Sequence, residues 1–118
     1  MAALAERPDL VWPTERITSP MVQEELAGPH PPLLLDVRSP REWTAKHIAG
    51  SLNIPLNHLQ ERIAEVPRDR RIALHCAGGY RSSIAASILH QHGITNLIEL
   101  AGGLAAWDAA KLPVITRS

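Results

Sequence analysis

Cys76 is the only cysteine in this chain and the residue best placed to act as a nucleophile. It follows an apolar segment, Ile72 to Leu74, and opens the small-residue loop Cys76-Ala77-Gly78-Gly79-Tyr80-Arg81. Such a loop can turn its backbone N–H groups towards the sulfur, and a following helix adds the positive end of its dipole. Because the thiolate is the nucleophilic form of cysteine, these surroundings and the Arg81 guanidinium predict a reactive thiol.

Three other interpretations of this cysteine are weaker. A free cysteine often packs as a small buried hydrophobe, but two glycines and an arginine directly behind it are not typical of an inert core position. A structural zinc site requires four Cys or His ligands at characteristic spacings, and the six histidines are scattered with no second cysteine to join them. A Walker-type phosphate loop needs a GxxxxGKS/T pattern, which is missing. We therefore expect neither a metal nor an organic cofactor.

The elements that must position the loop alternate between strand and helix. Apolar segments predict five strands, at residues 17–18, 33–37, 51–54, 71–75 and 96–100. Helices are predicted to begin at Ser19 and Ser39, each followed by a proline, and to cover residues 59–65, the segment from the loop to Gly93, and residues 104–111. This order predicts an α/β fold, an open and mainly parallel five-stranded sheet with helices on both faces. Ligands of such sheets bind beyond the carboxyl ends of the strands, where Cys76 falls.

The length and charge of the chain bound its organisation and its partners. With 118 residues we expect one domain, residues 16–118, preceded by an extension over residues 1–15 that has two prolines and no clear period. Twelve basic and twelve acidic residues cancel, so neither nucleic acid nor an anionic membrane is expected as a partner. The sequence lacks both a secretory h-region and an apolar run long enough to span a membrane, so a cytoplasmic location is predicted.

Four segments of the chain, in order, form a further pattern. They are Leu34-Leu35-Asp36-Val37-Arg38 with Glu42, then His47-Ile48-Ala49-Gly50-Ser51-Leu52-Asn53-Ile54-Pro55, then the loop from Cys76 to Arg81, and finally Gly102-Gly103 with Trp107. Together they resemble the motifs of a single rhodanese domain, a sulfurtransferase fold, over roughly residues 16 to 114. The resemblance implies that Cys76 takes up a sulfane sulfur as a persulfide. It also implies that backbone amides hold that sulfur, contributed by Ala77, Gly78, Gly79, Tyr80, Arg81 and Ser82.

The resemblance also indicates the substrates. Loops with this Ala-Gly-Gly-Tyr-Arg sequence are similar to those of rhodanese domains attached to persulfide dioxygenases, which implies exchange of sulfur between glutathione persulfide and thiosulfate. The expected donor is therefore thiosulfate or a low-molecular-weight persulfide, and the expected acceptor is a thiol, cyanide or a protein. With no second cysteine the chain cannot resolve the persulfide internally to a disulfide.

Two other classes of function stay open. The domain could be a sulfur carrier or a docking module, which would load sulfur without turning over small molecules. It could also be a phosphatase or an arsenate reductase, but those relatives of the fold resemble C-x5-R, whereas Cys76 and Arg81 give C-x4-R. A loop one residue shorter makes a tighter ring of amides, sized for a sulfur atom rather than for a tetrahedral anion.

Residues outside the loop are expected to support it. Asp36 is predicted to pair with Arg38 or Arg41, and Arg38 is also placed to bridge to Glu42 across the start of a short helix. His75 precedes the nucleophile but should pack on the opposite face of its strand, because neighbouring strand side chains alternate. The hydroxyls that follow Arg81, on Ser82 and Ser83, are predicted to cap the helix, with one of them donating to the sulfur.

Overall fold

The central sheet contains five parallel strands in the computed structural model, which describes residues 14–116. In spatial order they are β1 (Glu15–Ile17), β6 (Leu97–Leu100), β5 (Ile72–His75), β2 (Leu33–Asp36) and β4 (Leu52–Asn53). All four residues of β5 are buried, and this strand pairs with β2 on one side and with β6 on the other. The apolar run before Cys76 is thus the middle strand of the sheet, as its lack of polar alternation predicts.

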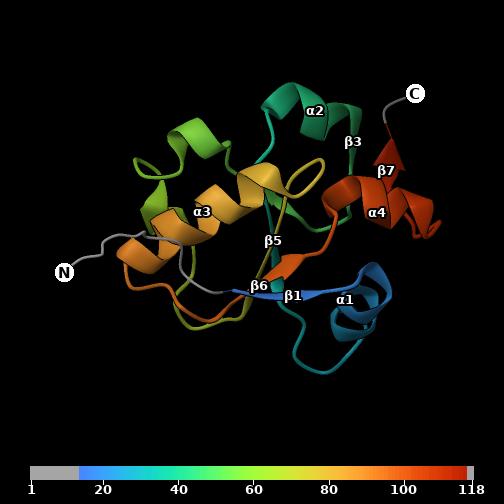
Figure 1. Ribbon diagram of the computed structural model, residues 1–118, viewed down its shortest axis with the longest axis horizontal. Helices are drawn as coiled ribbons and strands as arrows, with labels where there is room; N and C mark the ends of the chain where they lie inside the picture. Colours follow the sequence, from blue (N-terminus) through green and yellow to red (C-terminus); the bar gives the residue numbers. More distant parts are fainter. Residues whose placement is uncertain (1–13, 117–118) are drawn as a thin grey trace.

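Helices cover both faces of the sheet, as predicted. In Figure 1, α3 (Tyr80–Gln91) lies on one side together with two 3-10 helices, η1 (Leu56–His58) and η2 (Ile63–Glu65). On the other side are α1 (Ser19–Leu26) and α4 (Gly103–Ala109). The buried side chains form two clusters, one under each layer, and Cys76 belongs to the cluster beneath α3.

A small antiparallel pair adds an element that the sequence did not predict. The helix α2 (Pro40–Ala45) begins at the predicted capping box of Ser39 and Glu42 and leads into β3 (Lys46–His47). Two residues of β3 pair with β7 (Ile115–Thr116). An ion pair between Lys46 Nζ and Asp108 Oδ2, at 2.7 Å, lies beside this pairing. Together these contacts join α2 to the C-terminal part of the described chain.

The prediction of a helix over residues 59–65 was wrong. Between Pro55 and Pro67 the chain forms two separate 3-10 turns, η1 just before that segment and η2 at its end. Short 3-10 turns are frequent as connectors between elements, and prolines bound this segment on both sides. The buried side chains of Leu59 and Val66 tie it to the core beneath α3.

Most other boundaries agree with the sequence to within one or two residues. The N-cap of α1 is Thr18 rather than Ser19, and β1 runs from Glu15 to Ile17 rather than over residues 17–18. The predicted extension over residues 1–15 falls mostly outside the described residues and stays a prediction. Among residues 14–116, none of the helices is long and apolar enough to cross a membrane.

Candidate active site

Cys76 lies directly after β5, at the carboxyl edge of the sheet. The backbone N–H groups of Gly79 and Ser82 donate to its Sγ atom at 3.0 and 3.4 Å. The residue itself is only 1% exposed. The thiol is therefore held inside the curve of its own loop, and of the six amides predicted to hold the sulfur, those of Gly79 and Ser82 donate to Sγ.

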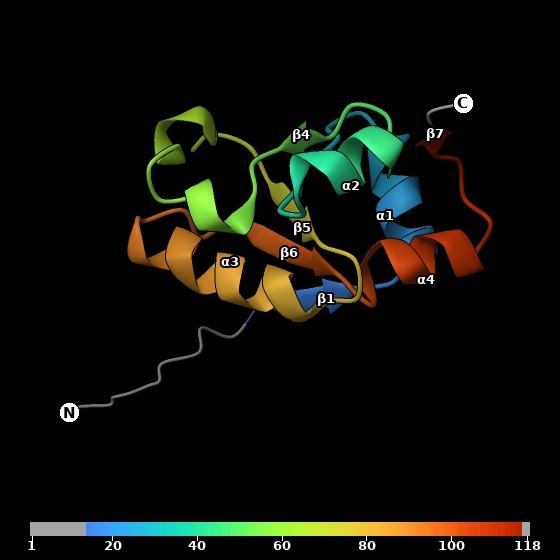
Figure 2. The ribbon, with the colours of Figure 1, turned by 90° about the horizontal axis from the view of Figure 1, so that it is seen from above.

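The loop takes this shape because α4 holds its first two carbonyls. The N–H of Leu104 donates to the Cys76 carbonyl at 2.8 Å, and the N–H of Ala105 donates to the Ala77 carbonyl at 3.0 Å. Figure 2 shows the loop running beside the first turn of α4. With these carbonyls bound to α4, the N–H groups further along the loop are free to face the sulfur.

Two glycines make this arrangement sterically possible. Gly79 has φ +106°, a conformation that side-chain-bearing residues rarely adopt, and it immediately precedes α3. A Cβ on Gly103 would lie 2.5 Å from the Cys76 carbonyl oxygen, so only glycine allows α4 to approach the loop this closely. The closing Gly102-Gly103 pair thus acts directly on the shape of the cysteine loop.

Arg81 is not a free cation. Its guanidinium forms two hydrogen bonds with the Glu42 carboxylate, at 2.8 and 3.0 Å, across the gap between α3 and α2. This bonding to Arg81 lowers the pKa of Glu42 from 4.5 to about 2 and raises the pKa of Arg81. The predicted bridge between Arg38 and Glu42 is therefore wrong, because Arg81 takes the carboxylate instead.

Arg38 pairs with Asp36 in the interior of the protein. The guanidinium donates to both carboxylate oxygens, at 2.8 to 3.1 Å, and also to the Lys46 carbonyl at 2.6 Å. Asn53 donates to the backbone carbonyls of Asp36 and Arg38, which fixes the turn after β2. Of the two partners predicted for Asp36 the structure selects Arg38, while Arg41 is exposed and lines a shallow hollow on α2.

His75 is fully buried behind the loop. Its Nδ1 atom lies 3.3 Å from the Cys76 carbonyl oxygen, and its Nε2 atom lies 3.6 Å from Asp36 Oδ2. Burial lowers the pKa of His75, so the imidazole stays neutral near pH 7. Its ring nitrogens face the carbonyl and Asp36, in line with the alternation that placed its side chain away from the thiol.

One of the hydroxyls of Ser82 and Ser83 was predicted to donate to the sulfur, and this prediction was wrong. Both lie within hydrogen-bonding distance of the Gly79 carbonyl and of the Glu99 carboxylate. It is the backbone N–H of Ser82 that faces Sγ. The hydroxyl of a first-turn serine bonds readily to a carbonyl three or four residues earlier, which explains the difference.

Glu99 is the buried group near the loop that sequence reasoning missed. It occupies the third position of β6, within the segment 96–100 that the sequence predicts as a strand from its apolar residues. A signal was present, because a carboxylate inside an otherwise apolar strand must find partners when it is buried.

The surface around the loop offers an open hollow beside Arg81. It has a volume of about 350 Å³ and is lined by Val37, Ser39, Pro55, Leu56, Asn57 and Arg81. The Tyr80 side chain is 79% exposed and does not cover the base of the loop. Within the described residues, the hollow lies at the same carboxyl edge of the sheet as the cysteine.

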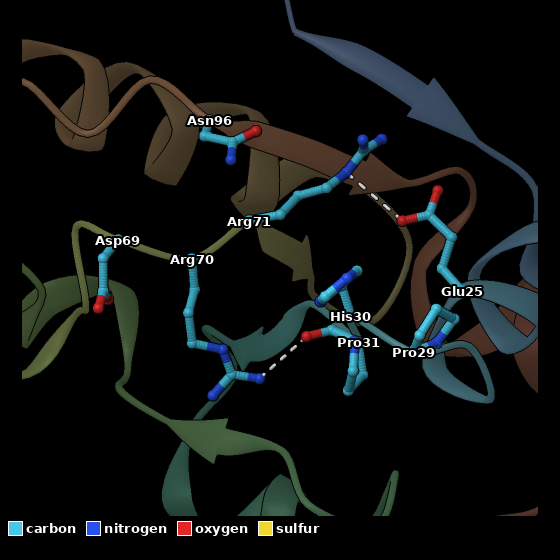
Figure 3. Close-up of a pocket in the computed structure, with 8 residues that line it drawn as sticks. All are labelled: Glu25, Pro29, His30, Pro31, Asp69, Arg70, Arg71 and Asn96. Atoms are coloured by element: carbon cyan, nitrogen blue, oxygen red, sulfur yellow. Dashed lines mark hydrogen bonds and ion pairs between the residues drawn. The ribbon is translucent and has the colours of Figure 1, made fainter.

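A larger hollow of about 700 Å³ lies at the opposite, amino-terminal edge of the sheet (Figure 3). Both of its arginines are directed at neighbouring groups. Arg71 forms an ion pair with Glu25 at 3.5 Å, and Arg70 donates to the Pro31 carbonyl at 3.1 Å. This groove takes no part in the chemistry of Cys76.

The parallel sheet, the cysteine at its carboxyl edge and the two backbone donors to Sγ define an α/β domain with a cysteine site. A family-wide sequence profile for the rhodanese-like domain matches residues 19–110. The chain therefore belongs to the rhodanese-like family.

Named relatives and a solved structure agree with this assignment. The chain is 33% identical over 99 residues to a protein of Allochromatium vinosum named sulfurtransferase, covering 84% of this chain and 92% of the relative. It is 39% identical over 72 residues to the thiosulfate sulfurtransferase PspE of Escherichia coli, covering 59% of this chain and 68% of that protein. The crystal structure of a rhodanese-related protein from Thermoplasma volcanium superposes with a TM-score of 0.79 at 33% identity, covering 87% of this chain and 99% of that one.

Proposed function

We propose that this protein is a sulfurtransferase that carries a sulfane sulfur on Cys76 as a persulfide. The observation that carries the proposal is the pair of backbone N–H groups, of Gly79 and Ser82, directed at Sγ. The relatives named sulfurtransferase support the class of reaction, and the C-x4-R loop favours a single sulfur atom over a tetrahedral anion.

The reaction has two displacement steps at sulfur. In the first, the Cys76 thiolate attacks the outer sulfur of thiosulfate, the S–S bond of the donor breaks, and sulfite leaves with the bonding electron pair. In the second, the thiolate of the acceptor attacks the outer sulfur of the Cys76 persulfide and leaves with it as a new persulfide, which restores the Cys76 thiolate. With cyanide as the acceptor the product is thiocyanate. Neither step requires an external oxidant or reductant.

The loop suits these steps because negative charge stays on sulfur throughout. Backbone donors that are already in place stabilise a developing anion without reorganising, as in an oxyanion hole. The α3 helix, twelve residues long, adds the positive end of its dipole to the same point. Because Arg81 is bonded to Glu42, we assign most of the stabilisation to the backbone rather than to that side chain.

The proposed donors are thiosulfate and glutathione persulfide, and the proposed acceptors are a thiol such as glutathione, cyanide or a protein. The name of the PspE relative supports thiosulfate. The hollow beside Arg81, lined by apolar side chains and by the polar Ser39 and Asn57, supports a thiol with a peptide-sized body. No cofactor takes part in the proposed reaction, and the cytoplasm is its proposed location.

The direct test is intact-mass measurement of the protein after incubation with thiosulfate or glutathione persulfide. We expect a gain of one sulfur atom, lost again on addition of cyanide or glutathione. Cys76→Ser should gain no sulfur and should lose all turnover, because a serine hydroxyl is far harder to deprotonate than a thiol.

The control separates loss of chemistry from loss of fold. Cys76→Ser should unfold at nearly the wild-type denaturant concentration, since it replaces one small buried side chain by another. Turnover by Cys76→Ser at the wild-type rate would refute the proposal. Stoichiometric loading of the wild type without turnover would instead identify a sulfur carrier.

A further inference from the structure

A buried carboxylate lies behind the cysteine loop with no role in the reaction described so far. Glu99 is 4% exposed and sits between the apolar residues Ile98 and Leu100 of β6. The strand register pairs it with Leu74 of β5, whose side chain packs in the cluster beneath α3. The Glu99 side chain therefore points at the first turn of α3, the turn that supplies donors to Sγ.

Two hydroxyls connect Glu99 to the loop. Glu99 Oε1 lies 3.0 Å from Ser82 Oγ and 3.2 Å from Ser83 Oγ. The same hydroxyls lie 3.1 and 3.3 Å from the Gly79 carbonyl oxygen. Each hydroxyl has one hydrogen to donate, so two donors serve two acceptors, the carbonyl and the carboxylate. With both serines present, one hydroxyl can donate to the carbonyl while the other donates to the carboxylate.

Arg16 supplies the charge that balances this carboxylate. It pairs with Glu99 in the register of β1 and β6, and its Nε atom lies 3.9 Å from Glu99 Oε2. Its Nη2 atom donates to Ser83 Oγ at 3.0 Å. Glu99 thus joins three elements, β1, β6 and the start of α3, through charge-assisted contacts.

We propose that Glu99 is a positioning residue for sulfur transfer, acting through the Ser82 and Ser83 hydroxyls. The inference rests on the proposed function of Cys76. Glu99 fixes the first turn of α3 at a set distance from β6, and that turn carries the N–H of Ser82 while Gly79 directly precedes it. The Ser82 N–H donates to Sγ at 3.4 Å, so this bond lasts only while the first turn of α3 keeps its place beside the cysteine.

Two substitutions at position 99 distinguish an effect of the hydrogen bonds that position α3 from an effect of the negative charge. Glu99→Gln keeps an oxygen that both hydroxyls can reach, and it should retain the wild-type kcat to within about threefold, because the donors stay in place. Glu99→Leu removes the acceptor, and its kcat for sulfur loading should fall about tenfold or more, as expected when a donor to a developing anion is weakened. KM for thiosulfate should not change in either variant, because Glu99 does not touch the donor. The lifetime of the Cys76 persulfide, followed by intact mass, should shorten in Glu99→Leu alone.

The serines provide a matched control. Ser83→Ala should lower kcat in the same way as Glu99→Leu. Ser87→Ala removes a hydroxyl one turn further along α3, which bonds only to the Ser83 carbonyl at 3.5 Å, and it should leave kcat unchanged. In the Ser82→Ala/Ser83→Ala background, adding Glu99→Leu should cost nothing further, because the residues act as one unit.

The outcomes distinguish failure of the positioning role of Glu99 from failure of the proposed function of Cys76. If wild-type protein forms the persulfide but Glu99→Leu keeps the wild-type kcat, only the positioning role is overturned. Equal losses in Glu99→Gln and Glu99→Leu would also overturn it, because they would assign the effect to charge. Failure of the wild-type protein to form a persulfide would refute the proposed function itself. Thermal unfolding of every variant, with assays run well below its midpoint, keeps loss of fold out of the comparison.

Discussion

At the scale of single residues, backbone N–H groups contribute more to stabilising negative charge on the sulfur than the sequence suggested. The sequence predicted that the Arg81 guanidinium helps to make the thiol reactive, but this side chain forms a two-bond ion pair with Glu42. Arg38 likewise forms an ion pair with Asp36. The groups left to meet a negative sulfur are the N–H groups of the loop and the dipole of α3. The rate of sulfur transfer should therefore change more when the backbone geometry of the loop changes than when one charged side chain is removed.

The ion pair between Glu42 and Arg81 should make stability depend on pH. Glu42→Gln keeps an oxygen to accept the Ser39 N–H of the capping box and removes the charge facing Arg81. The pKa of Glu42 is lowered from 4.5 to about 2, so the pair stabilises the fold fully above pH 4.5 and loses its effect as pH falls towards 2. Both side chains are about one third exposed, so screening limits the loss at pH 7 to about 1 kcal/mol or less.

Urea unfolding of wild type and Glu42→Gln between pH 7 and pH 2 measures this difference. The gap in the free energy of unfolding should be largest at neutral pH and should close at the acid end. The matched control is Glu65→Gln, which breaks an exposed pair with Arg62 and should change stability little at any pH. A gap of constant size across the whole pH range would contradict the assignment to the ion pair.

At the scale of elements, the loop and α4 form one unit. The N–H groups at the start of α4 bind the loop carbonyls, so the closing glycines act at the site although they lie about 25 residues beyond the cysteine. Short connections of this kind need particular backbone angles at particular positions. The three glycines around the loop should therefore differ sharply in their tolerance of a methyl group.

Alanine substitution of these glycines should give a graded series of activities. Gly78→Ala adds a Cβ with nothing within 4 Å and should keep the wild-type kcat. Gly79→Ala has room, its nearest contact being 3.9 Å away, but its φ of +106° should cost about 1–2 kcal/mol and turn its N–H away from Sγ. Gly103→Ala places a Cβ 2.5 Å from the Cys76 carbonyl oxygen and should be the most damaging.

The series is measured as the rate of persulfide formation together with the urea midpoint. Gly78→Ala is the internal control for the alanine change itself. A uniform effect at all three positions would contradict the view that backbone angle and close approach decide the outcome.

The sequence predicted those elements whose local signals agree with their packing. The capping box at Ser39, the glycine after α3 and the apolar run of β5 each specify a structure by themselves, and each was found. Residues 59–65 were predicted as a helix because the spacing of their apolar residues suits either a helix or 3-10 turns. The β3 and β7 pair could not be predicted, because two-residue strands carry no pattern and lie about 70 residues apart.

The site was predictable in its backbone and less so in its side-chain partners. The loop after a central strand, with two glycines and a helix behind it, indicated the amide ring. Which arginine takes which carboxylate depends on distances between α2, α3 and the turn after β2, and no spacing in the chain encodes those distances. Glu99 acts across three elements, so its role became visible only once Arg16 and the serines were seen beside it.

At the scale of the whole molecule, the two buried clusters hold the cysteine from both faces of the sheet. One cluster, beneath α3, contains Cys76 itself, and the other contains Trp107 of α4. Trp107 is fully buried, and its Nε1–H donates to the Pro113 carbonyl at 2.9 Å. The start of α4 binds the loop carbonyls. The packing of Trp107 in the second cluster therefore affects the position of the loop that holds Cys76.

Substitutions of Trp107 should therefore affect stability and sulfur transfer together. Trp107→Ala leaves a large cavity and should lower the free energy of unfolding by about 3–5 kcal/mol, a large share of the roughly 5–15 kcal/mol typical of a domain. Trp107→Phe keeps most of the packing and loses the bond to Pro113, so its loss should be smaller. Where the protein is still folded, loading of Cys76 should be slower in Trp107→Ala, because α4 no longer holds the loop firmly.

The control for this coupling is Val22→Ala, a fully buried change in the same cluster but on α1. It should lower stability, measured by urea unfolding, while leaving the kcat of the folded protein as in the wild type. The two variants are compared at a temperature where both are folded, so that differences in kcat report the loop rather than the folded fraction. If Trp107→Ala lost stability but kept the wild-type kcat, α4 would be a covering helix and the loop would hold its shape without it.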